Sequence, residues 1–165
     1  MHLLAALTPP NRLALEISLA TGLRISDVLG IKTEQVQKTA NGRITLRQLK
    51  TGKSTRVRLP NELRARCLSL SGRVWVFEHR HDWTRHRTRQ AVWKDLKRVA
   101  RLFRVKSNIA PHTARKVWAV DAFKRTGNIK RVQELLQHES EAVTAIYAMA
   151  DQLVGRRLSP RSARF

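Results

Sequence analysis

Six side chains in this sequence form a set whose chemical types suit cleavage of a phosphodiester bond without a metal ion. Two are guanidinium groups, one is an ammonium group, two are imidazoles and one is the single phenol of the chain. They are Arg24, Lys50, His112, Arg115, His138 and Tyr147. A phenol with a pKa of about 10 is a poor nucleophile at neutral pH unless nearby cations lower that pKa and a base accepts its proton. Taken together, the set predicts attack by Tyr147 on phosphorus.

The other side chains have complementary roles in such a reaction. His112 is a candidate for the base that accepts the phenol proton. Arginines hold the non-bridging oxygens of a phosphate through paired hydrogen bonds and offset the charge of the transition state. A lysine at the tip of a hairpin, such as Lys50, can protonate the leaving 5′-oxygen as a general acid.

Each of these positions, taken alone, has a simpler structural explanation. Arg24 can pair on the surface with Asp27, one helical turn later. Lys50 can be a solvated turn residue, and Tyr147 can pack on the apolar side of its helix. The two histidines and the second arginine can be ordinary polar groups on a helix face or in a loop. The catalytic interpretation therefore depends on the whole set.

The charge of the chain points to a polyanionic partner. Its 165 residues include 33 Lys and Arg against 12 Asp and Glu, a net charge of +21, far more than solubility requires. An anionic membrane surface competes with nucleic acid for this role, but no segment approaches the roughly 20 apolar residues of a spanning helix. The single Cys67 has no partner for an internal disulfide and no activating neighbour. We expect a cytoplasmic, nucleoid-associated protein that binds DNA or RNA.

Apolar residues spaced three and four apart predict helices along most of the chain. The predicted helices cover residues 9–22, 24–31, 61–70, 88–103, 111–127, 129–137 and 140–153. The longest apolar stripe is expected in the helix 88–103, formed by Val92, Leu96, Val99 and Phe103. Three of the four tryptophans are expected in or beside the core, namely Trp83, Trp93 and Trp118.

Alternating apolar and polar residues predict a β-hairpin over residues 42–49 and 54–60, with a turn around Gly52. A further strand is expected near residues 34–38. Another short strand is predicted over residues 73–77, followed by a polar loop rich in His and Arg. The fold class is thus α+β and mainly helical, with a small three-stranded antiparallel sheet.

Positive charge is concentrated between Arg80 and Lys106, which include ten Lys or Arg against two Asp. This segment and the hairpin are predicted to contact DNA phosphates. The predicted DNA-binding residues are Lys53, Arg85, Arg87, Arg89, Lys94, Lys97 and Arg98. Glu78, His79, His81 and His86 lie at and just before the start of this segment, but their spacing fits no common zinc site, so no metal site is predicted.

Four segments resemble the signature boxes of the tyrosine recombinases, also called phage integrases. These segments are TGLRISDVLGI, LKTGKSTRVRLP, PHTARKVWA and LQHESEAVTAIY. The resemblance implies that Arg24, Lys50, His112, Arg115 and His138 act on the scissile phosphate, with Asp27 orienting the active site and Lys53 a weaker alternative to Lys50. It implies that Tyr147 forms a 3′-phosphotyrosyl link, so that religation needs no cofactor, ATP or metal.

The resemblance also implies a domain organisation and partners. Residues 1–150 would form the catalytic domain, without the N-terminal core-binding domain that most relatives carry. The basic residues 151–165 would form a tail that is mobile or docks on a neighbouring protomer. Double-stranded DNA, a homotetramer assembled on it and accessory DNA-bending proteins are the expected partners, and integration or excision of a mobile element is the expected outcome. A type IB topoisomerase and a catalytically inactive DNA-binding regulator are the alternatives.

Overall fold

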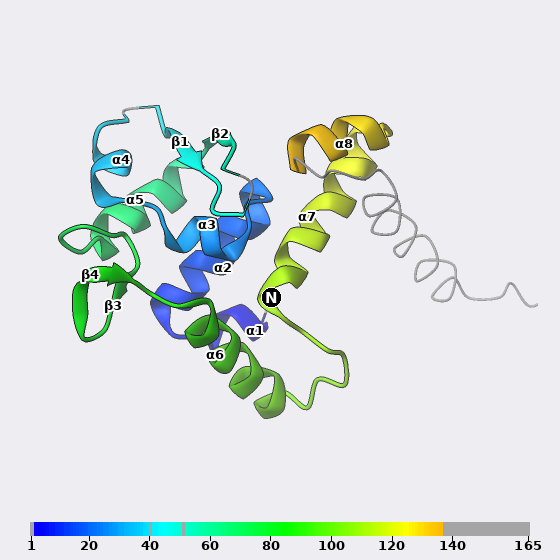
Figure 1. Ribbon diagram of the computed structural model, residues 1–165. Coiled ribbons are helices and arrows are strands. Elements are labelled where there is room, and N and C mark those ends of the chain that lie inside the picture. The colour runs from blue at the N-terminus through cyan, green and yellow to red at the C-terminus, as the bar shows by residue number, and fades with distance from the viewer. Residues whose placement is uncertain (1, 40, 51, 137–165) are drawn as a thin grey trace, which may run out of the picture. The chain divides into compact units, whose positions relative to one another are not determined.

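The computed structural model describes residues 2–39, 41–50 and 52–136. The chain divides into two compact units, the first ending at Arg115 and the second starting at Lys116. Figure 1 shows the elements of both. The first unit contains α1 (His2–Ala5), α2 (Pro9–Thr21), α3 (Ile25–Leu29), α4 (Thr33–Gln37), β1 (Arg43–Arg47), β2 (Ser54–Arg58), α5 (Asn61–Leu70), β3 (Glu78–His79), β4 (Asp82–His86), α6 (Arg89–Leu102) and the first turn of α7 (Pro111–Thr126). The predicted helices that fall on described residues are confirmed, with ends displaced by one or two residues, and so is the mainly helical α+β class.

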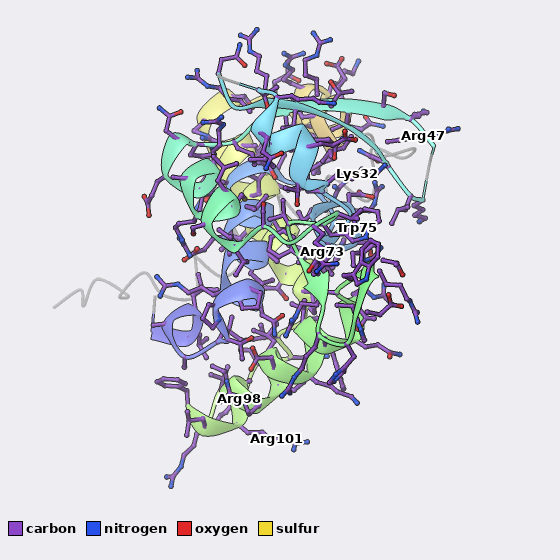
Figure 2. The ribbon with its side chains drawn as sticks, turned by 90° about the vertical axis from the view of Figure 1, so that its left-hand side faces the viewer. Lys32, Arg47, Arg73, Trp75, Arg98 and Arg101 are labelled. Atoms are coloured by element: carbon purple, nitrogen blue, oxygen red, sulfur yellow. The ribbon has the colours of Figure 1, made fainter. Side chains whose placement is uncertain are left out.

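The β1–β2 hairpin is confirmed as an antiparallel pair in which Ile44 faces Val57 and Arg47 faces Ser54. Alternation puts Ile44 and Leu46 in the core and leaves the intervening residues exposed. Arg47, at the end of β1, is one of these exposed residues and is labelled in Figure 2. The turn contains Gly52 at φ 66°, a left-handed conformation that glycine adopts without strain.

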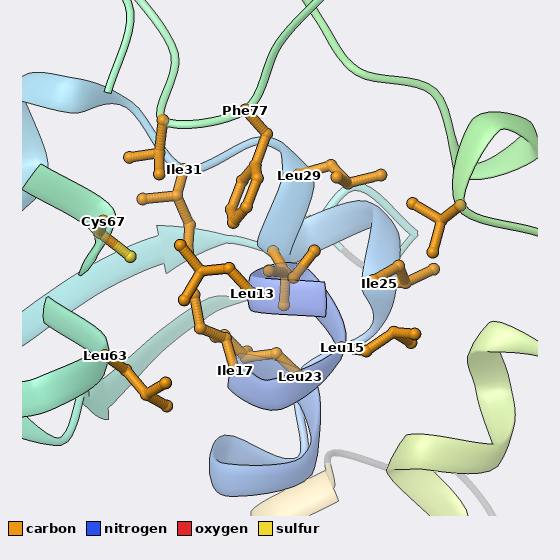
Figure 3. Packing of buried hydrophobic residues seen from close by; sticks show 14 of the residues in the cluster. Leu13, Leu15, Ile17, Leu23, Ile25, Leu29, Ile31, Leu63, Cys67 and Phe77 are labelled. Atoms are coloured by element: carbon orange, nitrogen blue, oxygen red, sulfur yellow. The ribbon is translucent and has the colours of Figure 1, made fainter. Parts of the chain in front are cut away.

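The core of the first unit forms around α2, which contacts α1, α3, α5 and α6. Leu13 and Ile17 on α2 meet Leu29 and Ile31 from the α3 region and Phe77 from the segment before β3 (Figure 3). All five are at most 2% exposed. Burial of each such side chain contributes about 1.5–3 kcal/mol, so this cluster forms a firm base for the elements that line the surface.

The strand predicted near residues 34–38 is wrong, because Thr33–Gln37 form the helix α4. Thr33 and Val36, three residues apart, are buried while Glu34 and Gln37 are exposed, which is helical spacing. The Gln35 side chain also accepts a hydrogen bond from the backbone of Lys32 at 2.9 Å and caps the first turn.

The strand predicted at residues 73–77 is also wrong, since a single bridge pairs Trp75 with Lys32. The backbone groups of this segment form the hydrogen bonds of a turn. The Gly72 N–H donates to the Trp75 carbonyl, and the Glu78 carboxylate accepts from the backbone N–H groups of Arg73 and Val74. The predicted polar loop is instead a hairpin of β3 and β4. Among the described residues, the strands therefore form two separate two-stranded sheets rather than one three-stranded sheet.

Helix α6 matches its prediction except at its end. The Thr88 hydroxyl accepts from the Ala91 backbone at 3.1 Å and caps the helix, and Val92, Leu96 and Val99 are buried. Phe103, predicted to be buried, is 46% exposed. The helix ends at Leu102, so Phe103 no longer continues the buried stripe.

The described part of the second unit comprises the rest of α7 and α8 (Ile129–Leu136). Ala119 and Ala122 of α7 pack with Val132 and Leu136 of α8, and Trp118 covers this small cluster. The predicted helix 140–153 and the tail 151–165 lie outside the described residues. None of the helices in the part that the structure describes has both the length and the apolar character needed to cross a membrane.

Candidate active site

A cleft of about 670 Å³ opens on the surface of the first unit. Three predicted catalytic residues, Arg24, His112 and Arg115, line it together with two predicted DNA-binding residues, Arg89 and Lys94. The remaining lining residues are Ile25, Ser26, Gln90, Trp93, Ala110 and Pro111. The cleft thus collects cations from the start of α3, from α6 and from the first turn of α7.

Gly22 links the two arginines of the cleft. It ends α2 in a left-handed conformation, with φ 72° and its N–H bonded to the Ser18 carbonyl. Arg24 follows two residues later, in extended conformation at the start of α3. The Gly22 carbonyl accepts a hydrogen bond of 2.6 Å from a terminal nitrogen of Arg115. One turn therefore sets the position of Arg24 and holds Arg115.

Arg115 is 3% exposed although it carries a full positive charge. Transfer of a cation out of water is costly unless polar or charged groups compensate for the lost hydration. The Gly22 carbonyl compensates in part, and an anion in the cleft would add an interaction that water cannot provide there. Such a guanidinium is suited to bind phosphate.

Asp27 lies one helical turn after Arg24 and is 4% exposed. One of its carboxylate oxygens lies 4.0 Å from a terminal nitrogen of Arg24, and the other accepts a hydrogen bond of 3.0 Å from the backbone of Leu49. The same terminal nitrogen of Arg24 donates to the side-chain oxygen of Gln48 at 2.5 Å. Asp27 thus contacts both the arginine and the residue that follows Gln48 on the hairpin, and its supporting role stays a prediction.

The predicted general acid Lys50 lies on the hairpin turn with an exposed side chain. Two backbone hydrogen bonds frame this turn, from Gln48 to the Lys53 carbonyl and from Gly52 to the Gln48 carbonyl. Neither lysine is among the residues that line the cleft in the described part of the chain. The turn nevertheless begins beside Asp27, because the Leu49 backbone donates a hydrogen bond to that carboxylate. His138 and Tyr147 lie outside the described residues.

A second groove, of about 570 Å³, follows α6 and shares Trp93 and Lys94 with the cleft. Its other lining residues are Lys97, Arg98, Arg101 and Leu102, and Figure 2 labels the two arginines on this helix. The Lys97 ammonium lies 5.8 Å from the centre of the Trp93 ring. Trp93 is 45% exposed and Trp83 is 50% exposed, so their predicted place in the core is wrong.

Two of the predicted DNA-binding arginines have internal partners. Arg87 donates to the Asn11 side chain at 2.7 Å. Arg98 donates twice to one oxygen of Asp95, at 2.8 and 3.0 Å, and also to the Ala6 carbonyl. Arg85, on β4, has an exposed side chain. The cations therefore differ in how far they are already used within the fold.

Asp95 is the centre of this internal network. Burial alone would raise the pKa of its carboxyl group. Hydrogen bonds from Asn11, from the backbone and hydroxyl of Thr8, and from Arg98 outweigh burial and lower that pKa to about 2. The carboxylate is therefore ionised under all ordinary conditions and ties α6 to the residues that begin α2.

The surface around β3 and β4 pairs cations with aromatic rings. The Arg73 guanidinium lies 5.6 Å from the Trp83 ring centre, and the Lys32 ammonium lies 6.0 Å from that of Trp75; Figure 2 labels Lys32, Arg73 and Trp75. Within the described residues, no three His, Cys, Asp or Glu side chains gather as metal ligands. Burial raises the pKa of the Cys67 thiol to about 12, so this thiol stays protonated and unreactive at neutral pH.

The sequence interpretation missed Gln48, which is 2% exposed and contacts Arg24 directly. One signal was available. Gln48 continues the alternation of Ile44 and Leu46, so it is a polar residue at a position that should face the core. A buried polar side chain requires a partner, and Arg24 is that partner.

Comparisons with known proteins agree with this architecture. The sequence model of the phage integrase family matches residues 1–153. The tyrosine recombinase XerD of Lacticaseibacillus casei is 30% identical over 151 residues, which cover 83% of this chain and 49% of that protein. The tyrosine recombinase XerA of Pyrococcus furiosus is 29% identical, with the same coverage of both chains. The chain thus spans about half the length of the curated relatives it matches.

Solved structures share the fold at lower sequence identity. The XerH site-specific recombinase bound to a palindromic difH substrate has a TM-score of 0.69 and 21% identity, covering 91% of this chain and 45% of that one. A lambda integrase dimer bound to a COC′ core site has a TM-score of 0.69 and 18% identity, covering 94% and 55%. The catalytic domain of bacteriophage HP1 integrase has a TM-score of 0.61 and 21% identity, covering 98% and 93%. With the family match across most of its length, the chain belongs to the phage integrase family.

Proposed function

We propose that this chain carries the catalytic centre of a site-specific DNA recombinase, which cleaves a strand of double-stranded DNA through Tyr147 and rejoins it. The supporting observation is the cleft, where Arg24 meets His112 and Arg115 from the opposite end of the first unit's sequence. Two guanidiniums at one site suit the two non-bridging oxygens of a phosphodiester. Membership of the family and the names of its relatives support the same activity.

Cleavage begins when the Tyr147 oxygen attacks the scissile phosphorus. The phenol proton passes to a base, for which His112 is the candidate in the cleft. A bond forms between the tyrosine oxygen and phosphorus, and the bond from phosphorus to the 5′-oxygen breaks. Arg24 and Arg115 offset the charge on the non-bridging oxygens. The Lys50 ammonium gives the leaving oxygen its proton, and His138 donates a hydrogen bond to the phosphate.

Rejoining is the same step in reverse. A 5′-hydroxyl attacks the 3′-phosphotyrosyl link, the tyrosine leaves and a phosphodiester forms again. One ester is exchanged for another in each direction, so the reaction needs no external energy source. Strand exchange results when the attacking hydroxyl belongs to a second duplex.

The proposed partners follow from this reaction and from the charge. A net charge of +21 suits the phosphate backbone, and the groove along α6 extends the cationic surface away from the cleft. Exchange between two duplexes needs more than one active site, so assembly as a tetramer on DNA is part of the proposal. A role for accessory DNA-bending proteins stays a prediction.

A covalent trapping experiment tests this proposal. The chain is incubated with a pool of nicked duplexes of random sequence, in which the short cleaved end diffuses away and the protein stays attached. Denaturing gels then reveal protein bound covalently to DNA, and sequencing of the recovered DNA identifies the preferred duplex. We expect an adduct with the wild-type chain and none with Tyr147→Phe.

The controls separate the proposal from its rivals. An adduct that survives Tyr147→Phe would contradict the role of that tyrosine, and loss of the adduct on addition of EDTA would contradict the metal-free mechanism. Relaxation of supercoiled plasmids without any preferred site would indicate a topoisomerase. Binding with a steep salt dependence but no adduct would indicate a regulator.

A further inference from the structure

The end of the first hairpin strand meets the active-site cleft through one buried amide. Gln48 follows β1 and is 2% exposed. Its side-chain oxygen accepts from Arg24 at 2.5 Å, and its side-chain nitrogen donates to the Thr55 hydroxyl on β2 at 3.3 Å. A guanidinium can only donate hydrogen bonds, so the amide oxygen has to face Arg24. The contact with Thr55 fixes the amide in that orientation.

We propose that Gln48 is a positioning residue that holds the Arg24 guanidinium for phosphate binding and couples it to the turn carrying Lys50. This inference rests on the proposed function, because it takes Arg24 as a ligand of the scissile phosphate. The hydrogen bonds that Gln48 makes do not depend on that function.

A neutral amide suits this position better than a second carboxylate. The Asp27 carboxylate already lies 4.0 Å from the same nitrogen of Arg24. Another negative charge would compete with the phosphate for the guanidinium and would oppose the approach of an anion. An amide oxygen fixes one nitrogen of Arg24 without neutralising its charge, so the arginine stays attractive to phosphate.

The backbone of Gln48 supplies the coupling to Lys50. Its N–H donates to the Lys53 carbonyl at 3.0 Å, and its carbonyl accepts from Gly52 at 2.8 Å. The next residue, Leu49, donates to Asp27 at 3.0 Å. Gln48 therefore touches Arg24 with its side chain and frames the turn of Lys50 with its backbone, so a displacement of either group is transmitted to the other.

Gln35 provides a matched control. It is also a glutamine that ties a helix to β1, because its side-chain nitrogen donates to the Thr45 carbonyl at 2.8 Å. Its side-chain oxygen caps α4 through Lys32, and it does not line the cleft in the described part of the chain. Both residues can be replaced by Met, which has a similar shape and cannot make either hydrogen bond.

The test measures binding of inorganic phosphate to the whole chain, followed by NMR through the His112 ring. We expect Gln48→Met to weaken phosphate binding roughly tenfold, as loss of a hydrogen bond to a charged group would, and Gln35→Met to leave it unchanged. In an Arg24→Ala background, Gln48→Met should have no further effect, because its target is gone. With the preferred nicked duplex at saturation, Gln48→Met should also slow adduct formation, because a displaced guanidinium offsets less charge in the transition state.

Three results would overturn the inference. They are an unchanged phosphate affinity in Gln48→Met, a loss of phosphate affinity on Gln48→Met that is as large in the Arg24→Ala background as in the wild type, and no phosphate-dependent shift of the His112 signals in the wild type. If Gln48→Met melts at a lower temperature, Thr55→Val serves instead, because it removes a hydrogen bond that helps to orient the amide. It should weaken phosphate binding about threefold, and an unchanged affinity would overturn the inference equally. A wild type that forms no adduct would contradict the proposed function, whereas the phosphate titration would still decide the role of Gln48.

Discussion

Two Asp–Arg pairs in the first unit have the same helical spacing but differ in how closely the two charged groups contact each other. Arg98 donates twice to Asp95 at 2.8 and 3.0 Å, and three further hydrogen bonds from Thr8 and Asn11 reach the same carboxylate. Arg24 stands 4.0 Å from Asp27 and is fixed instead by a neutral amide. The Arg98 side chain is 54% exposed and that of Arg24 is 19% exposed.

The comparison shows that exposure alone does not tell how firmly an arginine is paired within the fold. Arg98 is the more exposed, but its donors already satisfy Asp95 and the Ala6 carbonyl. Arg24 is less exposed, yet it faces a cleft beside His112 and Arg115. A tightly paired arginine stabilises the fold, whereas a loosely paired one beside a cleft retains its attraction for an anion.

The largest expected difference between the two pairs is in catalysis. Arg24→Ala should slow adduct formation on saturating duplex by roughly 10²- to 10⁴-fold, because it removes a contact to the charged phosphate. Arg98→Ala should change the rate less than threefold, since its donors point to Asp95. Single-turnover trapping measures both, and equal losses in the two variants would erase the distinction.

The next difference is in the free energy of unfolding. Asp95→Asn replaces an acceptor for five hydrogen bonds by a group that donates toward some of them, and it should destabilise the chain by about 2–3 kcal/mol. Asp27→Asn should cost about 1 kcal/mol, because Asp27 accepts one hydrogen bond from Leu49. Urea denaturation followed by circular dichroism compares the two, and a larger loss in Asp27→Asn would reverse the assignment of roles.

The smallest effect is on the pH dependence of stability. The pKa of Asp95 falls from 3.8 to about 2 on folding. Its stabilising contribution is complete above pH 3.8 and is lost as the pH falls through about 2. Allowing for screening by solvent, we expect the gap between wild type and Asp95→Asn to shrink by about 1–2 kcal/mol over this range. Acid titration of the two proteins measures the gap, and a constant gap would mean that the carboxylate is not held in its charged form.

The sequence predicted the parts of this structure that follow from local pattern. Helices α2, α6 and α7 have strong apolar spacing or clear caps, and the hairpin has both alternation and a glycine turn. Arg24, His112 and Arg115 were singled out because their types suit one reaction and the motifs around them are distinctive, and their catalytic role stays a prediction. Their meeting at one cleft depends on packing around α2, which no local pattern specifies.

The errors have a common physical origin. Residues 34–38 are too few and too polar for periodicity to separate a helix from a strand. Trp93 and Phe103 are large and apolar, but helix geometry and the end of α6 leave them at the surface. The DNA contacts predicted for Arg87 and Arg98 stay predictions, but a count of charges could not show that Arg87 bonds to Asn11, which is remote in sequence, or that Arg98 bonds to Asp95 one helical turn away. Gln48 was missed for the same reason, because its role depends on a contact with Arg24 across the fold.

The most direct test of the central claim concerns the charge that Arg24 offsets. The preferred nicked duplex is prepared with either a phosphodiester or a neutral methylphosphonate at the scissile position, and adduct formation is measured for the wild type and for Arg24→Ala. If Arg24 stabilises negative charge on the phosphate, its loss should cost roughly 10²- to 10⁴-fold on the phosphodiester and less than tenfold on the neutral substrate. Equal losses on the two substrates would contradict the claim that this cleft binds the scissile phosphate through Arg24.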